Sequence, residues 1–166
     1  MVRRILTGLV ALTIVVLSSG PVRAEDADQQ KYRQATGYST ETEFGKIEGT
    51  SAAGCRTVSK GYAFRNGYGA TMVLFVGNLR WCWSGGRVRS GSMWISVSRC
   101  CWWYYEGIVH QQNLGCFGGC TYVQKHRRGS FIFNPPWPTI TTRVQPWFTI
   151  TGYGNGAATA SSGGGA

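Results

Sequence analysis

Acidic residues are scarce in most of this 166-residue chain. Of its seven Asp and Glu residues, six lie before residue 49, only Glu106 follows, and no Asp occurs after Asp28. Hydrolysis by paired carboxylates needs two acids about 5 to 10 Å apart, and a Ser-His-Asp triad needs a carboxylate that orients its histidine. The scarcity of acids therefore makes both kinds of hydrolase difficult to build after residue 49.

Other enzyme motifs are missing as well. The chain has no G-x-S-x-G motif, no C-x-x-C motif, no phosphate-binding loop and no dinucleotide fingerprint. We therefore expect no nucleotide ligand and no cofactor. One pair remains for acid–base catalysis: if a strand runs from Cys100 to His110, then Glu106 and His110 share a face. The other interpretation is that Glu106 pairs with a basic residue and that Gly107 interrupts the strand.

No apolar run reaches the roughly 20 residues of a membrane-spanning helix. The run over residues 5–17 follows Arg3 and Arg4 and precedes Val22-Arg23-Ala24, which is the pattern of a secretory signal peptide rather than of a membrane anchor. We assign residues 1–24 to this signal and predict a secreted, extracellular protein. The arginine pair leaves open whether export follows the general or the twin-arginine route.

Six cysteines follow the predicted signal peptide, and thiols pair in an oxidising space. We expect three disulfides, with the pairing left open. Adjacent residues of a strand point to opposite faces, so Cys100 and Cys101 should have different partners. A metal site is an alternative, but its spacing is unlike that of structural zinc sites, and we expect no metal. The disulfide set is Cys55, Cys82, Cys100, Cys101, Cys116 and Cys120, and the alternative metal set is Cys116, Cys120, His110 and His126.

The chain after residue 49 shows the alternation of β-strands and no helical repeat of apolar residues. Most odd-numbered residues from 71 to 83 are apolar, and Gly85-Gly86 predicts a two-residue hairpin loop that places Val88 opposite Trp83. The pattern predicts an all-β fold, an antiparallel β-sandwich or barrel stabilised by disulfides. Further strands are expected within residues 93–98, 101–106, 121–133 and 139–153.

Charge and composition divide the rest of the chain. Residues 25–48 carry three basic and six acidic residues, a net charge of −3, and should form an extended or disordered acidic arm. Residues 49–153 form the predicted β-domain, and residues 154–166 a flexible tail of Gly, Ala and Ser. Residues 49–166 carry eleven basic residues and one acid, a net charge of +10. We expect the acidic arm to screen the basic surface.

Two groups of residues are candidates for binding. Trp102 and Tyr104 would flank Glu106 on a solvent-facing strip that suits a sugar ring, although they could instead belong to the core. Lys125, Arg127 and Arg128 form a basic run with His126 that should attract anionic polymers or a membrane surface, although such runs are often only solvated.

We therefore predict a secreted, non-catalytic protein that binds an extracellular glycan or an anionic cell-envelope polymer. The alternatives are a secreted hydrolase that uses Glu106 and His110, and a cationic antimicrobial or inhibitor protein.

The chain contains the aromatic motifs WCWSGGRV at 81–88, WYYEG at 103–107, FIF at 131–133 and ITGYGNG at 150–156. These motifs resemble those of a group of small, uncharacterised secreted proteins of actinobacteria. The resemblance covers about residues 50 to 156; it implies export and a β-rich fold and carries no catalytic residue to this chain. The chain departs from the group in its Cys100-Cys101 pair and in lacking aspartates near the turns.

Overall fold

The computed structural model describes Lys31 and residues 35–136 and 141–165. The predicted signal peptide, residues 1–24, lies outside the described residues, and so do much of the acidic arm before residue 35 and residues 137–140. No helix within the described ranges is long and apolar enough to cross a membrane. The described residues are mostly β-strand, and the strand neighbours all pair in the antiparallel sense.

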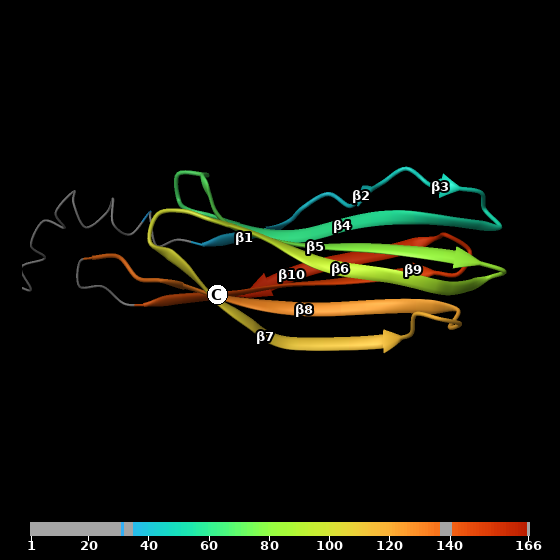
Figure 1. Cartoon of the computed structure of the whole chain (residues 1–166). Helices are drawn as coiled ribbons and strands as arrows, with labels where there is room; N and C mark the ends of the chain where they lie inside the picture. The colour runs from blue at the N-terminus through green and yellow to red at the C-terminus, as the bar shows by residue number, and fades with distance from the viewer. Residues whose placement is uncertain (1–30, 32–34, 137–140, 166) are drawn as a thin grey trace, which may run out of the picture.

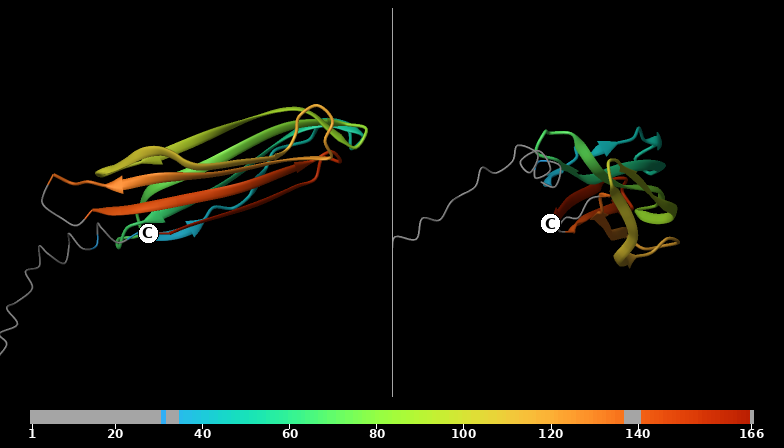
Figure 2. Two further views of the ribbon diagram at one scale, coloured as in Figure 1. Left: turned by 90° about the horizontal axis from the view of Figure 1, so that it is seen from below. Right: turned by 90° about the vertical axis from the view of Figure 1, so that its left-hand side faces the viewer.

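Two antiparallel sheets lie face to face and form an elongated sandwich (Figures 1 and 2). The first sheet has the order β1-β4-β5-β6, with the short strands β2 and β3 also paired to β4. The second sheet has the order β10-β9-β8-β7. The fold class predicted from sequence is confirmed as a sandwich, because the two sheets remain separate and do not close into a barrel.

The bounds of the first sheet's strands are β1 Thr36–Ser39, β2 Glu43–Phe44, β3 Glu48–Gly49, β4 Ala53–Arg65, β5 Thr71–Ser84 and β6 Arg87–Arg99. Those of the second sheet are β7 Trp103–Gly115, β8 Tyr122–Phe133, β9 Thr142–Tyr153 and β10 Ala158–Gly165.

The predicted hairpin between β5 and β6 is confirmed. Ser84 pairs with Arg87 across the Gly85-Gly86 loop, and both glycines have positive φ, as a tight two-residue turn requires. Trp83 faces Val88 as expected, and both side chains are buried. The apolar odd-numbered side chains of β5 point into the core, namely Val73, Phe75, Leu79, Trp81 and Trp83.

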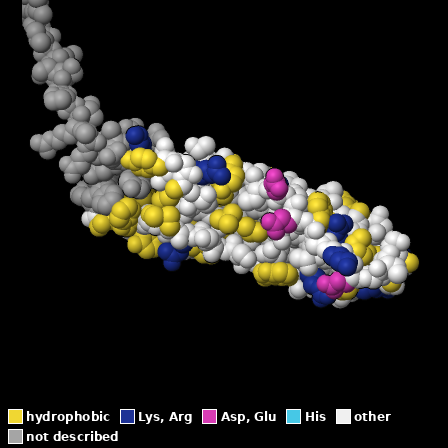
Figure 3. Space-filling model, turned by 90° about the horizontal axis from the view of Figure 1, so that it is seen from above, with side chains coloured by type: hydrophobic (Ala, Val, Ile, Leu, Met, Phe, Trp, Pro, Cys, Tyr) yellow, Lys and Arg dark blue, Asp and Glu magenta, His cyan; other side chains and the backbone are white. Residues whose placement is uncertain are grey.

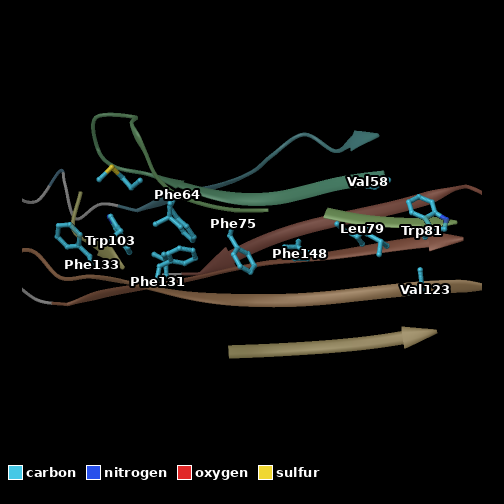
Figure 4. Packing of buried hydrophobic residues seen from close by; sticks show 14 of the residues in the cluster. Val58, Phe64, Phe75, Leu79, Trp81, Trp103, Val123, Phe131, Phe133 and Phe148 are labelled. Atoms are coloured by element: carbon cyan, nitrogen blue, oxygen red, sulfur yellow. The ribbon is translucent and has the colours of Figure 1, made fainter. Parts of the chain in front are cut away.

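The core is the layer of side chains between the two sheets (Figure 4). Its members come from both sheets and include the rings of Phe75, Trp81, Phe131 and Phe148. Phe75 lies 5.2 Å from Phe148 and 6.1 Å from Phe131 between ring centroids. Gly77 provides the space for Phe148, because a Cβ on Gly77 would lie only 2.1 Å from that ring. Such close packing leaves no room for a larger residue at Gly77.

The predicted flexible tail is wrong for residues 158–165, which form β10 along β9. Ala158 and Ala160 pack against the core, and Gly163 lies so close to Trp147 that an added Cβ would be 2.7 Å from the indole. Small residues are therefore required here by neighbouring rings, whereas in the sequence they are typical of a linker. The described part of the acidic arm is extended, because β1, β2 and β3 pair with β4.

The cysteines differ from the expectation of three disulfides. Cys55 bonds to Cys82 across β4 and β5, and Cys116 bonds to Cys120 in the loop between β7 and β8, while Cys100 and Cys101 are free. The adjacent pair does not lie on a strand, because β6 ends at Arg99 and a turn follows. The alternative metal set is not formed either, since Cys116 and Cys120 have no free thiol.

We expect the two disulfides to differ in their contribution to stability. Cys55–Cys82 spans 27 residues and Cys116–Cys120 spans 4, and a longer closed loop restricts the unfolded chain more. Replacing both cysteines of the longer link with Ala should lower the free energy of unfolding by on the order of 3 to 4 kcal/mol, against about 2 kcal/mol for the shorter one. Urea denaturation measures both, and equal losses would contradict the expectation.

Gly77→Ala should destabilise the fold because the new methyl group would enter the space of Phe148. We expect a loss of about 1 to 3 kcal/mol in the free energy of unfolding. Gly165→Ala is the matched control, since a Cβ there meets no atom within 4 Å, and it should change stability by less than about 0.5 kcal/mol. Thermal denaturation of both variants checks this, and an unchanged Gly77→Ala protein would refute the packing argument.

Candidate functional site

One side of the second sheet faces solvent and carries most of its polar side chains; we call it the outer face. Successive residues of a strand alternate between the two sides, so β8 contributes His126, Arg128 and Ser130 to this face while Phe131 and Phe133 enter the core. On β9 the alternation places Arg143, Gln145 and Trp147 outward and Val144 and Phe148 inward. The strands thus gather basic, amide and aromatic side chains on one surface.

A cleft of about 500 Å³ opens on the outer face. Arg128 and Trp147 are direct neighbours across β8 and β9, and Trp147 is in turn opposite Gly163 of β10. The indole therefore lies over glycine backbone, with Gly165 at the end of the cleft. The cleft is lined by Arg128, Arg143, Gln145, Trp147 and Gly165.

Arg128 has an unused hydrogen-bond donor at this cleft. Its Nε is buried and has no hydrogen-bond partner within the described part of the chain, a state it shares only with the indole nitrogen of Trp103 in the core. Buried donors are nearly always paired in folded proteins. A guanidinium in this position is suited to bind a carboxylate or phosphate, which accepts two parallel hydrogen bonds from Arg.

The second arginine of the cleft is held by Glu106. The Arg143 Nε and Nη2 atoms donate to the Glu106 carboxylate at 3.0 and 3.2 Å, and the Ser130 hydroxyl donates to it at 2.6 Å. The hydrogen bond from Arg143, followed by that from Ser130, lowers the pKa of Glu106. The hydrogen bond to Glu106, followed by the charge of this carboxylate, raises the pKa of Arg143. The interpretation that Glu106 pairs with a basic residue is confirmed, and the ionised carboxylate orients Arg143.

Three aromatic rings lie in a row on the outer face, those of His110, His126 and Trp147. His110 contacts His126 edge to face with ring centroids 5.4 Å apart, and His126 lies 5.8 Å from Trp147. His126 also forms a 2.8 Å hydrogen bond with the Thr149 hydroxyl. Burial, followed by the charges of His110, Arg128 and Arg127, lowers the pKa of His126. The ring is therefore neutral at neutral pH.

Glu106 and His110 lie on β7 as expected but do not form an acid–base pair. Two bulges interrupt the pairing of β7 with β8, between Tyr105 and Gly107 and between Ile108 and His110, and Gly107 has a φ of 114°. The expectation that Gly107 interrupts the strand is wrong, because β7 continues through Gly107 and only its register with β8 shifts there. Glu106 binds Arg143, whereas His110 contacts His126.

The predicted basic run is divided between the two sides of β8. Arg128 faces the cleft, whereas the Lys125 ammonium lies 5.2 Å from the Phe117 ring on the opposite side. Arg127 bonds to the Gln112 carbonyl and the Asn113 side chain of β7. Strand alternation separates neighbours in the sequence, so the run does not form one continuous binding surface.

The predicted aromatic strip is exposed but lies outside the cleft. Trp102 is 37% and Tyr104 47% exposed. Trp102 occupies the turn before β7, with a φ of 68°, and Tyr104 lies under the Arg99 guanidinium at 5.6 Å. Sequence reasoning missed Gln145 and Trp147; the alternation of polar and apolar residues from Arg143 to Phe148 was the available signal.

The described part of the acidic arm from residue 36 onward pairs with the other sheet. Glu41 and Glu43 line a smaller cavity of about 210 Å³ together with Ser59 and Asn78, on the solvent side of the first sheet. Figure 3 views the molecule from the side of β2 and β4 and shows acidic side chains in the middle of this surface. The ion pair of the described arm joins Glu48 to Arg80 at 2.6 Å. The acidic residues of the described part of the arm, Glu41, Glu43 and Glu48, therefore do not line the cleft of Arg128 and Arg143, and the expectation that the arm screens the basic surface is wrong for these three residues at this cleft.

The structure thus defines an all-β antiparallel sandwich with an arginine-lined cleft on the outer face of one sheet. Comparison of the chain with protein-family models, with curated proteins and with solved structures found no match.

The lowered pKa of His126 makes stability depend on pH. Below about pH 6.5 the unfolded chain binds a proton at this imidazole that the folded chain does not, so the free energy of unfolding falls as the pH drops through this range. His126→Gln should reduce the loss of stability between about pH 7.5 and about pH 5.5, as measured by urea denaturation. His110→Gln removes only one of the charges that lower the pKa of His126 and keeps its burial, the first cause, so this variant should reduce the loss less. If His126→Gln retains the full pH dependence, His126 is not its source.

Proposed function

We propose that this protein is a secreted binding protein for an anionic glycan, a cell-envelope sugar polymer that carries carboxylate or phosphate groups, and that the cleft on the outer face is its binding site. The observation that carries the proposal is the pair Arg128 and Arg143 beside Trp147 in one cleft. The two disulfides are compatible with an extracellular location.

Each side chain of the cleft has a part in this proposal. Arg128, whose Nε has no hydrogen-bond partner within the described residues, donates from its guanidinium to an anionic group of the sugar. Arg143 uses Nε and Nη2 on Glu106, which leaves Nη1 for the ligand and holds the guanidinium in one orientation. Trp147 offers an indole face for the C–H face of a sugar ring, and the Gln145 amide can bond to hydroxyl groups.

The charge of the whole domain supports the same ligand class. Residues 49–166 have a net charge of +10, which raises the local concentration of a negatively charged polymer near the surface. Charge alone would attract any polyanion, so the specificity in this proposal comes from Trp147 and Gln145. The hydrolase alternative has no comparable support, because Glu106 and His110 are engaged with different partners.

Binding to polygalacturonate, a polymer of carboxylated sugars, tests the proposal. Arg128→Gln should weaken the affinity about tenfold or more, since a hydrogen bond to a charged group contributes about 1.5 to 3 kcal/mol, and Trp147→Ala should weaken it several-fold, about as much as other lost aromatic contacts. Titration calorimetry measures both affinities.

Two control variants separate a specific site from general charge attraction. Arg89→Gln removes the same charge from an exposed residue of β6, and Trp94→Ala removes an exposed tryptophan of the first sheet; both should bind almost like the wild type. Equal weakening by Arg128→Gln and Arg89→Gln would overturn the site. Polyphosphate, which has no sugar, should bind without dependence on Trp147, and a neutral galactan should bind weakly.

A further inference from the structure

The turn between β6 and β7 has an unusual backbone. Trp103 N–H donates to the Cys100 carbonyl at 3.1 Å, and the two residues between them, Cys101 and Trp102, have φ values of 53° and 68°. These are the only non-glycine residues with positive φ in the described part of the chain. Such strained positions occur preferentially at functional sites.

This turn brings three sulfur atoms together. Cys100 Sγ lies 3.6 Å from Met72 Sδ, and Cys101 is the next residue of the turn, with its thiol near enough to influence the Cys100 thiol. The Cys100 N–H also donates to the Met72 carbonyl at 3.0 Å, which anchors the turn to β5. Met72 is buried, Cys100 is half-buried and Cys101 is exposed. The three sulfurs therefore extend from the edge of the core to the solvent.

The ligand types select among metal ions. The described residues contain no group of three His, Cys, Asp and Glu side chains that could hold a metal, so this turn lacks the four ligands that a zinc site needs. A thioether is a soft ligand, and two thiolates with a thioether suit Cu(I). Cu(I) accepts few ligands, so it fits a site in which Met72 is buried and Cys101 is open to solvent.

We propose that Cys100, Cys101 and Met72 form a binding site for Cu(I). Binding releases the two thiol protons and forms bonds from the metal to both cysteine sulfurs and to the methionine sulfur, with no change in the oxidation state of the copper. The site explains why these two cysteines are unpaired while the other four form disulfides. It lies in the turn after β6 and is separate from the cleft of Arg128 and Trp147.

The test uses the full chain with reduced Cys100 and Cys101 under anaerobic conditions. Cu(I) is titrated against a chromophoric Cu(I) chelator, and the thiolate-to-copper absorption in the ultraviolet is followed. We expect one Cu(I) per chain and two reactive thiols that are lost when copper binds. Cys101→Ser should abolish the absorption and the tight binding.

Met72→Leu tests the third ligand, because this change conserves volume and keeps the fold. It should weaken Cu(I) binding about tenfold or more, while Met93→Leu, a half-buried methionine of β6, should bind like the wild type. Equal affinity of Met72→Leu and the wild type would overturn the three-sulfur site. A bond between Cys100 and Cys101 in the freshly isolated protein, or tighter binding of Zn²⁺ than of Cu(I), would overturn it as well.

Discussion

Large aromatic rings that pack against glycine backbone hold the two sheets of this protein together. Phe148 occupies the space above Gly77, Trp81 lies against Gly152, and Trp83 lies against Gly156. Each contact removes a ring from water and needs a partner with no side chain, so the close approach of the sheets depends on where the glycines stand. Glycine increases the conformational entropy that the chain loses on folding. The core nevertheless requires glycine at these positions, because no other residue leaves room for the rings.

The same constraint connects the core to the binding surface. β10 consists of Gly, Ala, Ser and one Thr, and its alanines face the core while Gly163 lies under Trp147 on the outer face. A larger residue at Gly163 would displace the indole from the cleft. The strand that resembles a linker in composition therefore supports the tryptophan next to Arg128. On the other side of the cleft, the ion pair with Glu106 holds Arg143.

The sequence predicted the strands and the hairpin, because these depend on residues that are close together in the chain. The alternation in β5 and the Gly85-Gly86 loop predicted which side chains enter the core. The sequence did not predict the cleft as a whole. Lys125, Arg127 and Arg128 are consecutive or nearly so in the sequence, yet only Arg128 faces the cleft, and its partners Arg143, Gln145 and Trp147 lie on the next strand. Trp102 and Tyr104 are exposed but remain outside this cleft.

The sequence by itself determined the all-β fold, the excess of positive charge after residue 49 and the alternation of each long strand, since these are properties of composition and local periodicity. Only the tertiary structure decided which cysteines bond, that residues 158–165 form a strand, and that the described part of the acidic arm pairs with the sheet opposite to the arginine cleft. These features depend on strand order and register between distant segments. The physical reason is that register is set by the packing of both sheets against a shared core, which no local stretch of residues contains.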